Sequence, residues 1–385
     1  MALSREVLTR VRDGHARQLA QFRIPDTERD APQETLPFSS EDLVDWIKAN
    51  PAAIQAAKDA QCRSTSSDTP NWDVILFALI ESSAVYLRKR DSVFKAIEAA
   101  NKGDFTSARQ YLLEAQEYID DVAAALDCTF VQLCDFAKVS PDGYTLHSGA
   151  YCGVFVSNDT LKPFMGVGYK GSSSLRDWVT DLDWTPLQAE GDIAFGSLVH
   201  QGFYVGLFGK FTSDGESMIP FEVMIGQLLL VNQQRENALL HFTGHSLGGA
   251  YCTLTYGEFL RRQNLLDTFN FGDMYSIAAP RTCLEPFAAE VGQRATTTTG
   301  RIIFRIVNES DPVPTIPPRT TDQLEQYPFV HVDGAWHIFY EKGPEPMASE
   351  QPPNSPVDPL PIPSIIWNAT DHSTYSRRMR CYFSF

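Results

Sequence analysis

Apolar residues in the first third of the chain recur at the spacing of an amphipathic helix. Between positions 106 and 126 they lie on one helical face. They are Ala108, Tyr111, Leu112, Ala115, Ile119, Val122 and Leu126. Similar patterns predict an apolar helix over 73–90, and a shorter helix that Ser39 or Ser40 caps and Pro51 ends. The first 36 or so residues are charged and contain several prolines, so we expect irregular structure there.

From about Phe130 the pattern changes to short runs rich in β-branched and aromatic residues, bounded by turn residues. These runs predict strands at 148–156, 164–169, 239–242, 274–278 and 301–307. Helical patterns lie between them, among them 221–234 and 251–262. Strands that alternate with helices predict an α/β fold with a mostly parallel central sheet flanked by helices.

The division of the chain follows from this change of pattern. We expect a helical N-terminal extension over 1–70 and one larger domain over 71–385. The segment Gly343–Pro363 contains eight prolines among 21 residues, which predicts a surface loop. The seven cysteines are scattered without the spacing of a zinc site, so we expect free thiols.

Composition and charge limit the partners of the protein. The net charge of -16 repels nucleic-acid phosphates and anionic lipid headgroups, so a neutral substrate is favoured and nucleic acid is not expected. No apolar run approaches the roughly 20 residues of a transmembrane helix. The N-terminal residues lack the apolar core of a signal peptide, so we expect a cytoplasmic or otherwise unexported protein. The alternative is a secreted protein whose leader is absent from this sequence.

The stretch HFTGHSLGGAYC, at 241–252, carries the pattern G-x-S-x-G around Ser246. A predicted strand precedes it and a predicted helix follows it, which is the setting in which this motif holds a nucleophilic serine. Gly244 and Gly248 allow a sharp turn that larger side chains would obstruct. The alternative is a serine that caps an ordinary helix after a glycine turn.

A nucleophilic serine requires a base and a carboxylate that orients the base, and in such folds they follow it as acid and then histidine. His372, in the loop-like stretch NATDHSTYS, fits the base, whereas His331 and His337 are interpreted as structural or supporting residues. Asp311 directly follows the strand 301–307, where functional residues collect in parallel sheets. Asp371 is a poorer candidate, because an acid adjacent to His372 in the sequence cannot easily reach around to its Nδ1.

The chain resembles the class 3 lipases, the family of fungal secreted triacylglycerol lipases. Five segments carry the resemblance in the family's order: YKGSSSLRDWVTDLDW, VHQGFY, TGHSLGGA, VNESDPVP and ATDHSTYS. The resemblance covers roughly residues 70 to 385 and implies an α/β-hydrolase fold with Ser246, Asp311 and His372 as the triad. It also implies that the GSSS turn forms half of the oxyanion hole. The chain departs from the family at Lys170, where Arg is usual.

The oxyanion hole has a chemical rationale of its own. Acyl transfer places negative charge on the former carbonyl oxygen, so donors must already face that position. The N–H of Leu247, directly after the serine, is one donor. Ser172 follows a predicted strand and can offer both its N–H and its hydroxyl as the second.

A short amphipathic helix is predicted directly after this turn. Its apolar face consists of Leu175, Trp178, Val179 and Leu182. By resemblance it is a mobile lid that covers the serine in water and turns the Trp178 face toward lipid. The alternative is a surface helix packed on the body of the enzyme.

These residues together predict a serine hydrolase that cleaves acylglycerols at a transient lipid–water interface, without metal or cofactor. A phospholipase A1 or a feruloyl-type esterase with the same triad is an alternative within the enzymes. A different alternative is an inactive lipase-like protein that binds lipid or a partner. The pattern of residues does not indicate an oligomeric state.

Overall fold

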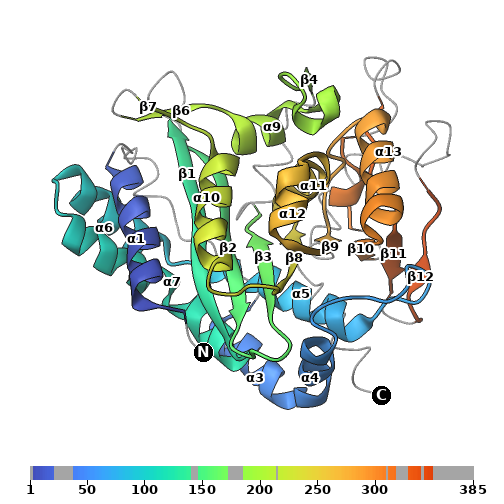
Figure 1. The fold of residues 1–385 in the computed structure, drawn as a ribbon, viewed down its shortest axis with the longest axis horizontal. Helices are drawn as coiled ribbons and strands as arrows, with labels where there is room; N and C mark the ends of the chain where they lie inside the picture. The colour runs from blue at the N-terminus through green and yellow to red at the C-terminus, as the bar shows by residue number, and fades with distance from the viewer. Residues whose placement is uncertain are drawn as a thin grey trace.

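An eight-stranded sheet forms the centre of the protein, in the order β1-β2-β3-β8-β9-β10-β11-β12 (Figure 1). The computed structural model describes residues 3–20, 38–139, 146–171, 185–213, 216–308, 311–317, 328–339 and 342–349. The strands are β1 (Cys128–Val139), β2 (Leu146–Ser157), β3 (Phe164–Tyr169), β8 (Leu239–His245), β9 (Asn270–Ile277), β10 (Ile303–Asn308), β11 (Ala335–Ile338) and β12 (Glu345–Pro346).

The five strands β3, β8, β9, β10 and β11 are parallel to one another. At the two edges, β1, β2 and β12 pair antiparallel with their neighbours. The prediction of an α/β fold with a mostly parallel central sheet is therefore confirmed. Two small hairpins lie outside this sheet, β4 (Pro186–Gln188) with β5 (Leu198–His200) and β6 (Phe211–Ser213) with β7 (Glu216–Met218).

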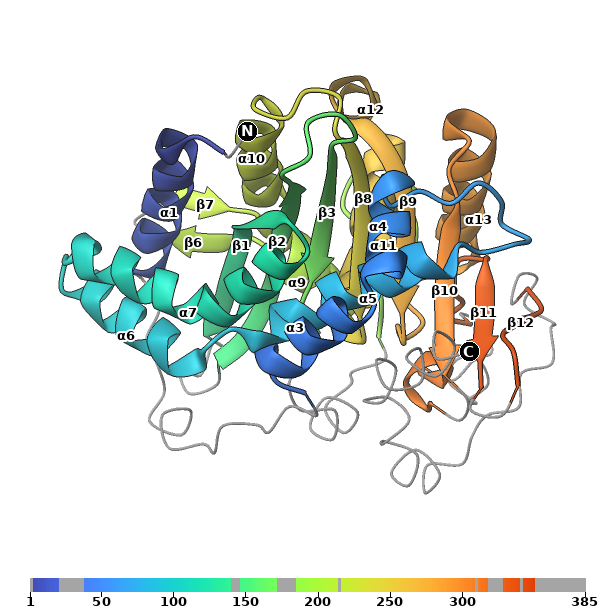
Figure 2. The same cartoon turned by 90° about the horizontal axis from the view of Figure 1, so that it is seen from below.

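Helices cover both faces of the sheet, as the view from below shows (Figure 2). One hydrophobic core contains α9 (Gln201–Phe208), α10 (Pro220–Asn232), α11 (Leu247–Arg261), α12 (Gln263–Thr268) and α13 (Glu285–Gln293). The other contains α3 (Ser40–Ala49), α4 (Pro51–Asp59), α5 (Trp72–Ala84) and α7 (Phe105–Ala125). Along β8, Leu240 and Phe242 lie in the first core and Leu239 in the second, because successive side chains of a strand alternate between faces.

The N-terminal residues are more regular than the sequence interpretation proposed. A helix, α1, covers Arg5–Leu19, so the expectation of irregular structure is wrong for this part. Ser4 caps it by accepting a hydrogen bond from the Val7 N–H at 3.3 Å. Val7 and Val11 are buried at a four-residue spacing. The prolines that suggested irregularity all lie beyond position 24 and do not constrain this helix.

The apolar helix expected over 73–90 is also corrected, because α5 ends at Ala84. A 3₁₀ turn, Val85–Leu87, follows it, and a separate helix, α6 (Arg90–Asn101), begins three residues later. Arg88, between them, has an extended backbone and pairs with Asp135 of β1. No proline or glycine lies at this break in the sequence, so no local signal predicts it. The long-range ion pair between Arg88 and Asp135 accompanies the bend.

Pro51 and the proline-rich segment each have a second role beyond the one predicted. Pro51 does follow the end of α3, but it is also the first residue of α4, where a missing N–H costs nothing. Of 343–363, the structure describes 343–349, which is exposed apart from half-buried positions and contains the two-residue strand β12.

The helices before residue 70 share the two cores of the sheet. Val7 and Val11 of α1 belong to the core of α10 and α11, whereas Leu43 and Trp46 of α3 belong to that of α5. In Figure 1, α1, α6 and α7 lie beside the β1 edge. The division of the chain into 1–70 and 71–385 stays a prediction.

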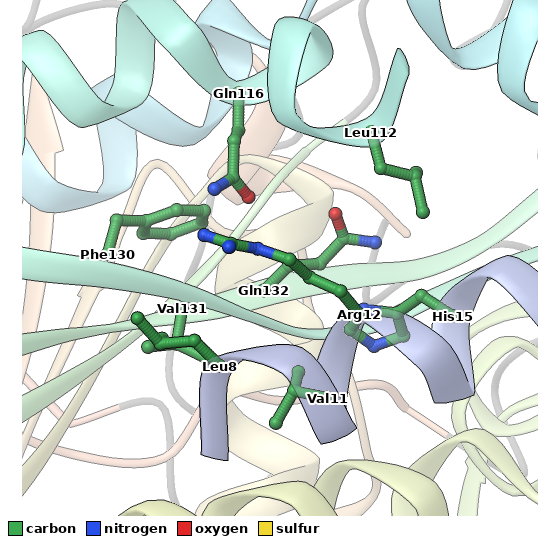
Figure 3. Close-up of a pocket in the computed structure, with 9 residues that line it drawn as sticks. All are labelled: Leu8, Val11, Arg12, His15, Leu112, Gln116, Phe130, Val131 and Gln132. Carbon is green, nitrogen blue, oxygen red and sulfur yellow. The ribbon is translucent and has the colours of Figure 1, made fainter. Parts of the chain in front are cut away.

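A small cavity lies between α1, α7 and β1 (Figure 3). It is lined by Leu8, Val11, Arg12, His15, Leu112, Gln116, Phe130, Val131 and Gln132. Figure 3 shows the side chain of Arg12 extending to a position between Phe130 and Gln116. The cavity is three strands away from β8 in the sheet order, so it is separate from the serine turn.

The acid beside this cavity gives a testable pH dependence. Burial raises the pKa of Asp120 to about 6, although a hydrogen bond from Gln116 and the charge of Arg12 oppose the rise. A carboxyl whose pKa is higher in the folded chain favours folding only while protonated, so this contribution is lost as pH rises from about 4 to about 6. We expect Asp120→Asn to match the wild-type free energy of unfolding near pH 4. At pH 7 it should exceed the wild type by up to about 3 kcal/mol, as urea denaturation would measure. A pH-independent difference would contradict the assignment.

Among the helices in the described ranges, none has the length and apolar character needed to cross a membrane.

Candidate active site

Ser246 lies in the sharp turn between the end of β8 and the start of α11. Its backbone has φ 59° and ψ -130°, a strained conformation for a residue with a side chain. The Ser246 N–H donates to Ile277 O of β9 at 2.9 Å, and the Ser246 carbonyl accepts from the Gly249 N–H at 2.9 Å. The neighbouring strand and the first turn of α11 thus hold the strained residue from both sides.

The glycines on either side of Ser246 are required by close packing. A Cβ on Gly244 would overlap the carbonyl oxygen of Gly248, and a Cβ on Gly248 would overlap the carbonyl oxygen of Tyr169 at the end of β3. The strand, the glycine turn and the helix expected from the sequence are therefore all present. Ser246 itself is 2% exposed.

Asp311 lies directly beyond the end of β10 and is 2% exposed. Its N–H donates to Asn308 O at 2.8 Å, and its Oδ1 accepts from the Val313 N–H at 3.0 Å. The second bond closes an Asx-type turn that leads into a 3₁₀ helix, Val313–Thr315. The turn fixes the rotation of the carboxyl group.

Ser246 and Asp311 lie at the same edge of the sheet. They follow the carboxyl ends of β8 and β10, which are both parallel to β9 between them. Two strand spacings separate the strand ends by about 10 Å. An imidazole between the serine and the carboxylate could bridge this distance. His372, the residue predicted for that position, lies outside the described residues.

Of the two predicted oxyanion donors, Leu247 lies at this turn. Leu247 is the first residue of α11, so its N–H is one of the four at a helix start that have no acceptor within the helix. Ser172 is not among the residues that the structure describes. The residue before it, Gly171, packs against the serine turn, since a Cβ there would lie 2.6 Å from His245 O and 3.0 Å from Ser246 Cβ.

Tyr86 joins these two parts of the site and was not anticipated from the sequence. Its hydroxyl oxygen lies 3.1 Å from His245 Nδ1 and 3.2 Å from His245 O. A Cβ on Gly171 would overlap the same hydroxyl. Lys170 Nζ lies 5.5 Å from the centre of the Tyr86 ring. Tyr86 lies in the 3₁₀ turn after α5, so no local signal connects it with the motif at 244–248.

We expect Tyr86→Phe to lower both stability and ester hydrolysis, because it removes the hydroxyl that contacts His245. The free energy of unfolding should fall by about 1 kcal/mol, the usual value of one hydrogen bond. The value of kcat/KM on a dissolved short-chain ester should fall several-fold. Tyr118→Phe is the matched control. It removes the same hydroxyl group from a tyrosine that is 43% exposed and lies in α7, a different helix from the turn of Tyr86. Equal kcat/KM for the two variants would contradict a role for the Tyr86 hydroxyl.

A buried acid–imidazole pair lies behind the serine strand. Glu81 Oε2 is 2.6 Å from His241 Nε2, and both side chains are fully buried. Burial raises the pKa of Glu81, while the His241 partner acts in the opposite direction. The pair ties α5 to β8, the strand that ends at Ser246. The signal in the sequence is a single acid at the end of the apolar run 74–81.

The remaining predicted residues fall into two groups. The lid residues are outside the described ranges: Leu175, Trp178, Val179 and Leu182. His331 is buried and its Nε2 lies 2.7 Å from Pro314 O, in the loop of Asp311. His337 lies in β11, with its ring 4.1 Å from that of Phe339.

Two further features bear on metals and thiols. Within the part of the chain that the structure describes, no three His, Cys, Asp or Glu side chains converge as metal ligands. The six described cysteines are buried and form no disulfide with one another. Cys381 lies in the C-terminal range that is not described.

Comparison with known proteins shows which family this chain resembles. A family model described as Lipase (class 3) matches residues 166–321. The chain is 27% identical to a lipase of Rhizomucor miehei over 230 residues, 59% of this chain and 58% of that protein. It is 26% identical to the chloroplastic phospholipase A1 PLIP2 of Arabidopsis thaliana, over 46% of this chain and 23% of that protein.

Among solved structures, the Rhizomucor miehei lipase propeptide complex is similar with a TM-score of 0.45 and 21% identity. That similarity covers 67% of this chain and 71% of the other. The chain spans 58% of the length of the Rhizomucor miehei lipase and 23% of the length of the phospholipase A1 PLIP2.

Proposed function

We propose that this chain, whose residues 166–321 match the family model of the class 3 lipases, is a serine carboxylic-ester hydrolase and that neutral acylglycerols are its substrates. The proposal assigns Ser246 as the nucleophile, His372 as the general base and Asp311 as the carboxylate that orients the base. Leu247 N–H and Ser172 are the proposed oxyanion donors.

The proposed reaction is acyl transfer in two steps. The Ser246 hydroxyl loses its proton to His372 and attacks the ester carbonyl, and the tetrahedral oxyanion is held by the two donors. The alcohol then leaves with the proton from His372, and the acyl group remains on Ser246. Water repeats the sequence and releases the acid. Asp311 keeps the imidazole in the tautomer that accepts the serine proton.

The observation that carries the proposal is the strained backbone of Ser246. A φ of 59° is costly for serine, yet the turn is held by β9 and by α11. This conformation points the residue away from the strand at the sheet edge where Asp311 also lies. An ordinary helix-capping serine has extended backbone angles, so capping alone would not require the positive φ.

The proposed substrate class follows from the charge of the protein. The net charge of -16 disfavours anionic ligands, which favours uncharged glycerides over phospholipids. A phospholipase A1 activity is the second candidate, because the chain matches the Arabidopsis phospholipase A1 PLIP2. We further propose that 175–182 acts as a lid at the lipid–water interface, and that the protein is unexported.

Hydrolysis of a matched substrate series tests this proposal. Tri-, di- and monoglycerides, a phosphatidylcholine and a feruloyl ester would be compared, the lipids all with the same acyl chain. We expect the highest kcat/KM on a glyceride, and none of the rates should remain in Ser246→Ala. A preference for phosphatidylcholine would transfer the protein to the phospholipase candidate. If no ester were hydrolysed in a Ser246-dependent way, the proposal would fail, and the alternative of an inactive lipase-like protein that binds lipid or a partner would be favoured.

A further inference from the structure

The loop that carries Asp311 is held by residues from two other parts of the chain. This loop, 311–317, contains three prolines, which have no N–H to anchor it. Its carbonyl groups are used instead. The carbonyl groups of Pro312 and Val313 accept hydrogen bonds from within the loop. The first that accepts one from outside it, Pro314 O, lies 2.7 Å from His331 Nε2. Because a carbonyl oxygen can only accept, the Nε2 of His331 must carry the proton and donate.

Arg281 binds the next three carbonyl groups of the same loop. Its Nη1 donates to Thr315 O and, at 2.8 Å, to Pro317 O. Its backbone N–H donates to Ile316 O at 2.7 Å. Four successive carbonyl groups, from 314 to 317, are therefore held by two residues.

Burial makes these contacts specific in geometry. Arg281 is 1% exposed and His331 is 4% exposed. Burying a guanidinium costs free energy unless its N–H groups form hydrogen bonds. Breaking the two carbonyl contacts of Arg281 would therefore be unfavourable. Both bonds come from one nitrogen, Nη1, whose two hydrogens are fixed in the plane of the guanidinium, so this plane defines where the two carbonyl groups can lie. A lysine ammonium would supply charge without this geometry.

The segment before Arg281 also holds the serine turn. Ile277 O accepts the Ser246 N–H at 2.9 Å, and the next residue, Ala278, donates to Ile306 O of β10 at 2.9 Å. Arg281 follows three residues after Ala278. One short stretch of chain thus contacts the turn of the nucleophile at its start and the loop of the acid at its end.

We propose that Arg281 and His331 are positioning residues that keep the Asp311 carboxylate in register with Ser246. The inference rests on the proposed function, in which Asp311 orients the base. It adds that the loop, with its three prolines, depends on these outside donors for its place. Neither residue contacts the substrate in this scheme. A misplacement of about 1 Å in such a group lowers turnover on the order of 10²-fold.

The first test compares Arg281→Met with the wild type on a dissolved short-chain ester. Active sites are counted by titration with a fluorophosphonate, whose phosphorus is attacked by the serine with loss of fluoride. We expect kcat per titrated site to fall on the order of 10²-fold, with KM within about threefold. The acidic limb of the kcat/KM profile should move to lower pH, because the imidazolium loses its aligned carboxylate.

Two variants separate positioning from general stability. Arg281→Lys should lose activity nearly as far, since it keeps the charge but not the planar group whose Nη1 hydrogens have fixed directions. Arg235→Met is the matched control, because Arg235 is also buried and donates to a backbone carbonyl group, that of Gln234. Arg235 precedes the start of β8, whereas Ser246 follows its end. It should change stability but neither kcat per titrated site nor the pH profile. A normal kcat and pH profile in Arg281→Met would overturn the proposal.

The second test uses His331 and remains available if the Arg281 variants do not fold. His331→Gln keeps an N–H donor toward Pro314 O, whereas His331→Leu removes it. We expect Leu to lower kcat per titrated site at least tenfold and Gln to restore most of it. Equal losses in both would overturn the role of the donor.

A double substitution links the effect to the acid. In an Asp311→Asn background, Arg281→Met should cost less than about threefold, because no carboxylate remains to be misplaced. A full 10²-fold loss in that background would show that Arg281 acts by another route and overturn the proposal. These outcomes differ from failure of the proposed function, in which hydrolysis by the wild-type protein would not depend on Ser246.

Discussion

Ser246→Ala is expected to lower kcat on any ester substrate by about 10⁶, the loss seen when a triad acts as a unit. The reason is that no other hydroxyl occupies the turn between β8 and α11, so the acyl-enzyme cannot form. Fold should be retained, because the backbone bonds of Ser246 to Ile277 and Gly249 do not involve its side chain. Steady-state hydrolysis and labelling by a fluorophosphonate would measure the loss.

Two controls accompany this variant. Ser82→Ala removes a hydroxyl that is equally buried but bonds within its own helix to Leu79 O, and its activity should stay close to the wild type. Ser246→Gly should be as inactive as Ser246→Ala yet more stable by roughly 1 kcal/mol, because glycine adopts a φ of 59° without strain. Substantial turnover in Ser246→Ala would reject the proposed nucleophile.

Asp311→Asn is expected to lower kcat by about 10⁴, the second largest effect. The amide can keep the acceptor that binds the Val313 N–H, so the loop should retain its shape. It cannot stabilise the positive imidazolium, and an amide N–H toward the ring favours the wrong tautomer. The measurement is kcat per titrated site on a dissolved ester, with the free energy of unfolding to show that the fold persists.

The neighbouring acid of the predicted base provides the comparison. Asp371→Asn should leave kcat within a few-fold of the wild type, because Asp371 is adjacent to His372 in sequence and cannot readily reach around to the far ring nitrogen. If Asp371→Asn were the damaging variant and Asp311→Asn were active, the acid would have to be reassigned. The positioning role proposed for Arg281 would then be wrong, because the loop that it binds would not carry the catalytic acid.

Much of the fold follows from local patterns. Apolar runs between turn residues are typical of buried parallel strands and predict strands at 239–242 and 301–307. The structure has strands at Leu239–His245 and Ile303–Asn308. The helix α7 matches the predicted 106–126 within one residue at each end, because its apolar face has an unbroken helical period. The helix α1 is not predicted, because the charged residues and the prolines that follow it, from Pro25 to Pro37, indicate irregular structure. The break after Ala84 has no local signal at all.

The candidate site divides in the same way. The spacing of Gly244, Ser246 and Gly248 indicates a nucleophile turn, since glycines at those positions are needed wherever the backbone must turn sharply between a strand and a helix. The position of Asp311 follows from the end of its strand. The roles of His372, Ser172 and the lid stay predictions, because those residues lie outside the described ranges.

The sequence by itself determined the α/β fold class and the serine turn, because each strand, each helix and the turn depend on residues within a few positions of one another. The tertiary structure alone brought Tyr86 to His245 across 159 positions, and Arg281 to Thr315 across 34. Such contacts depend on which strands become neighbours in the sheet and which helices cover them. No short window of the sequence contains that information, because hydrophobic burial selects a face but not a partner.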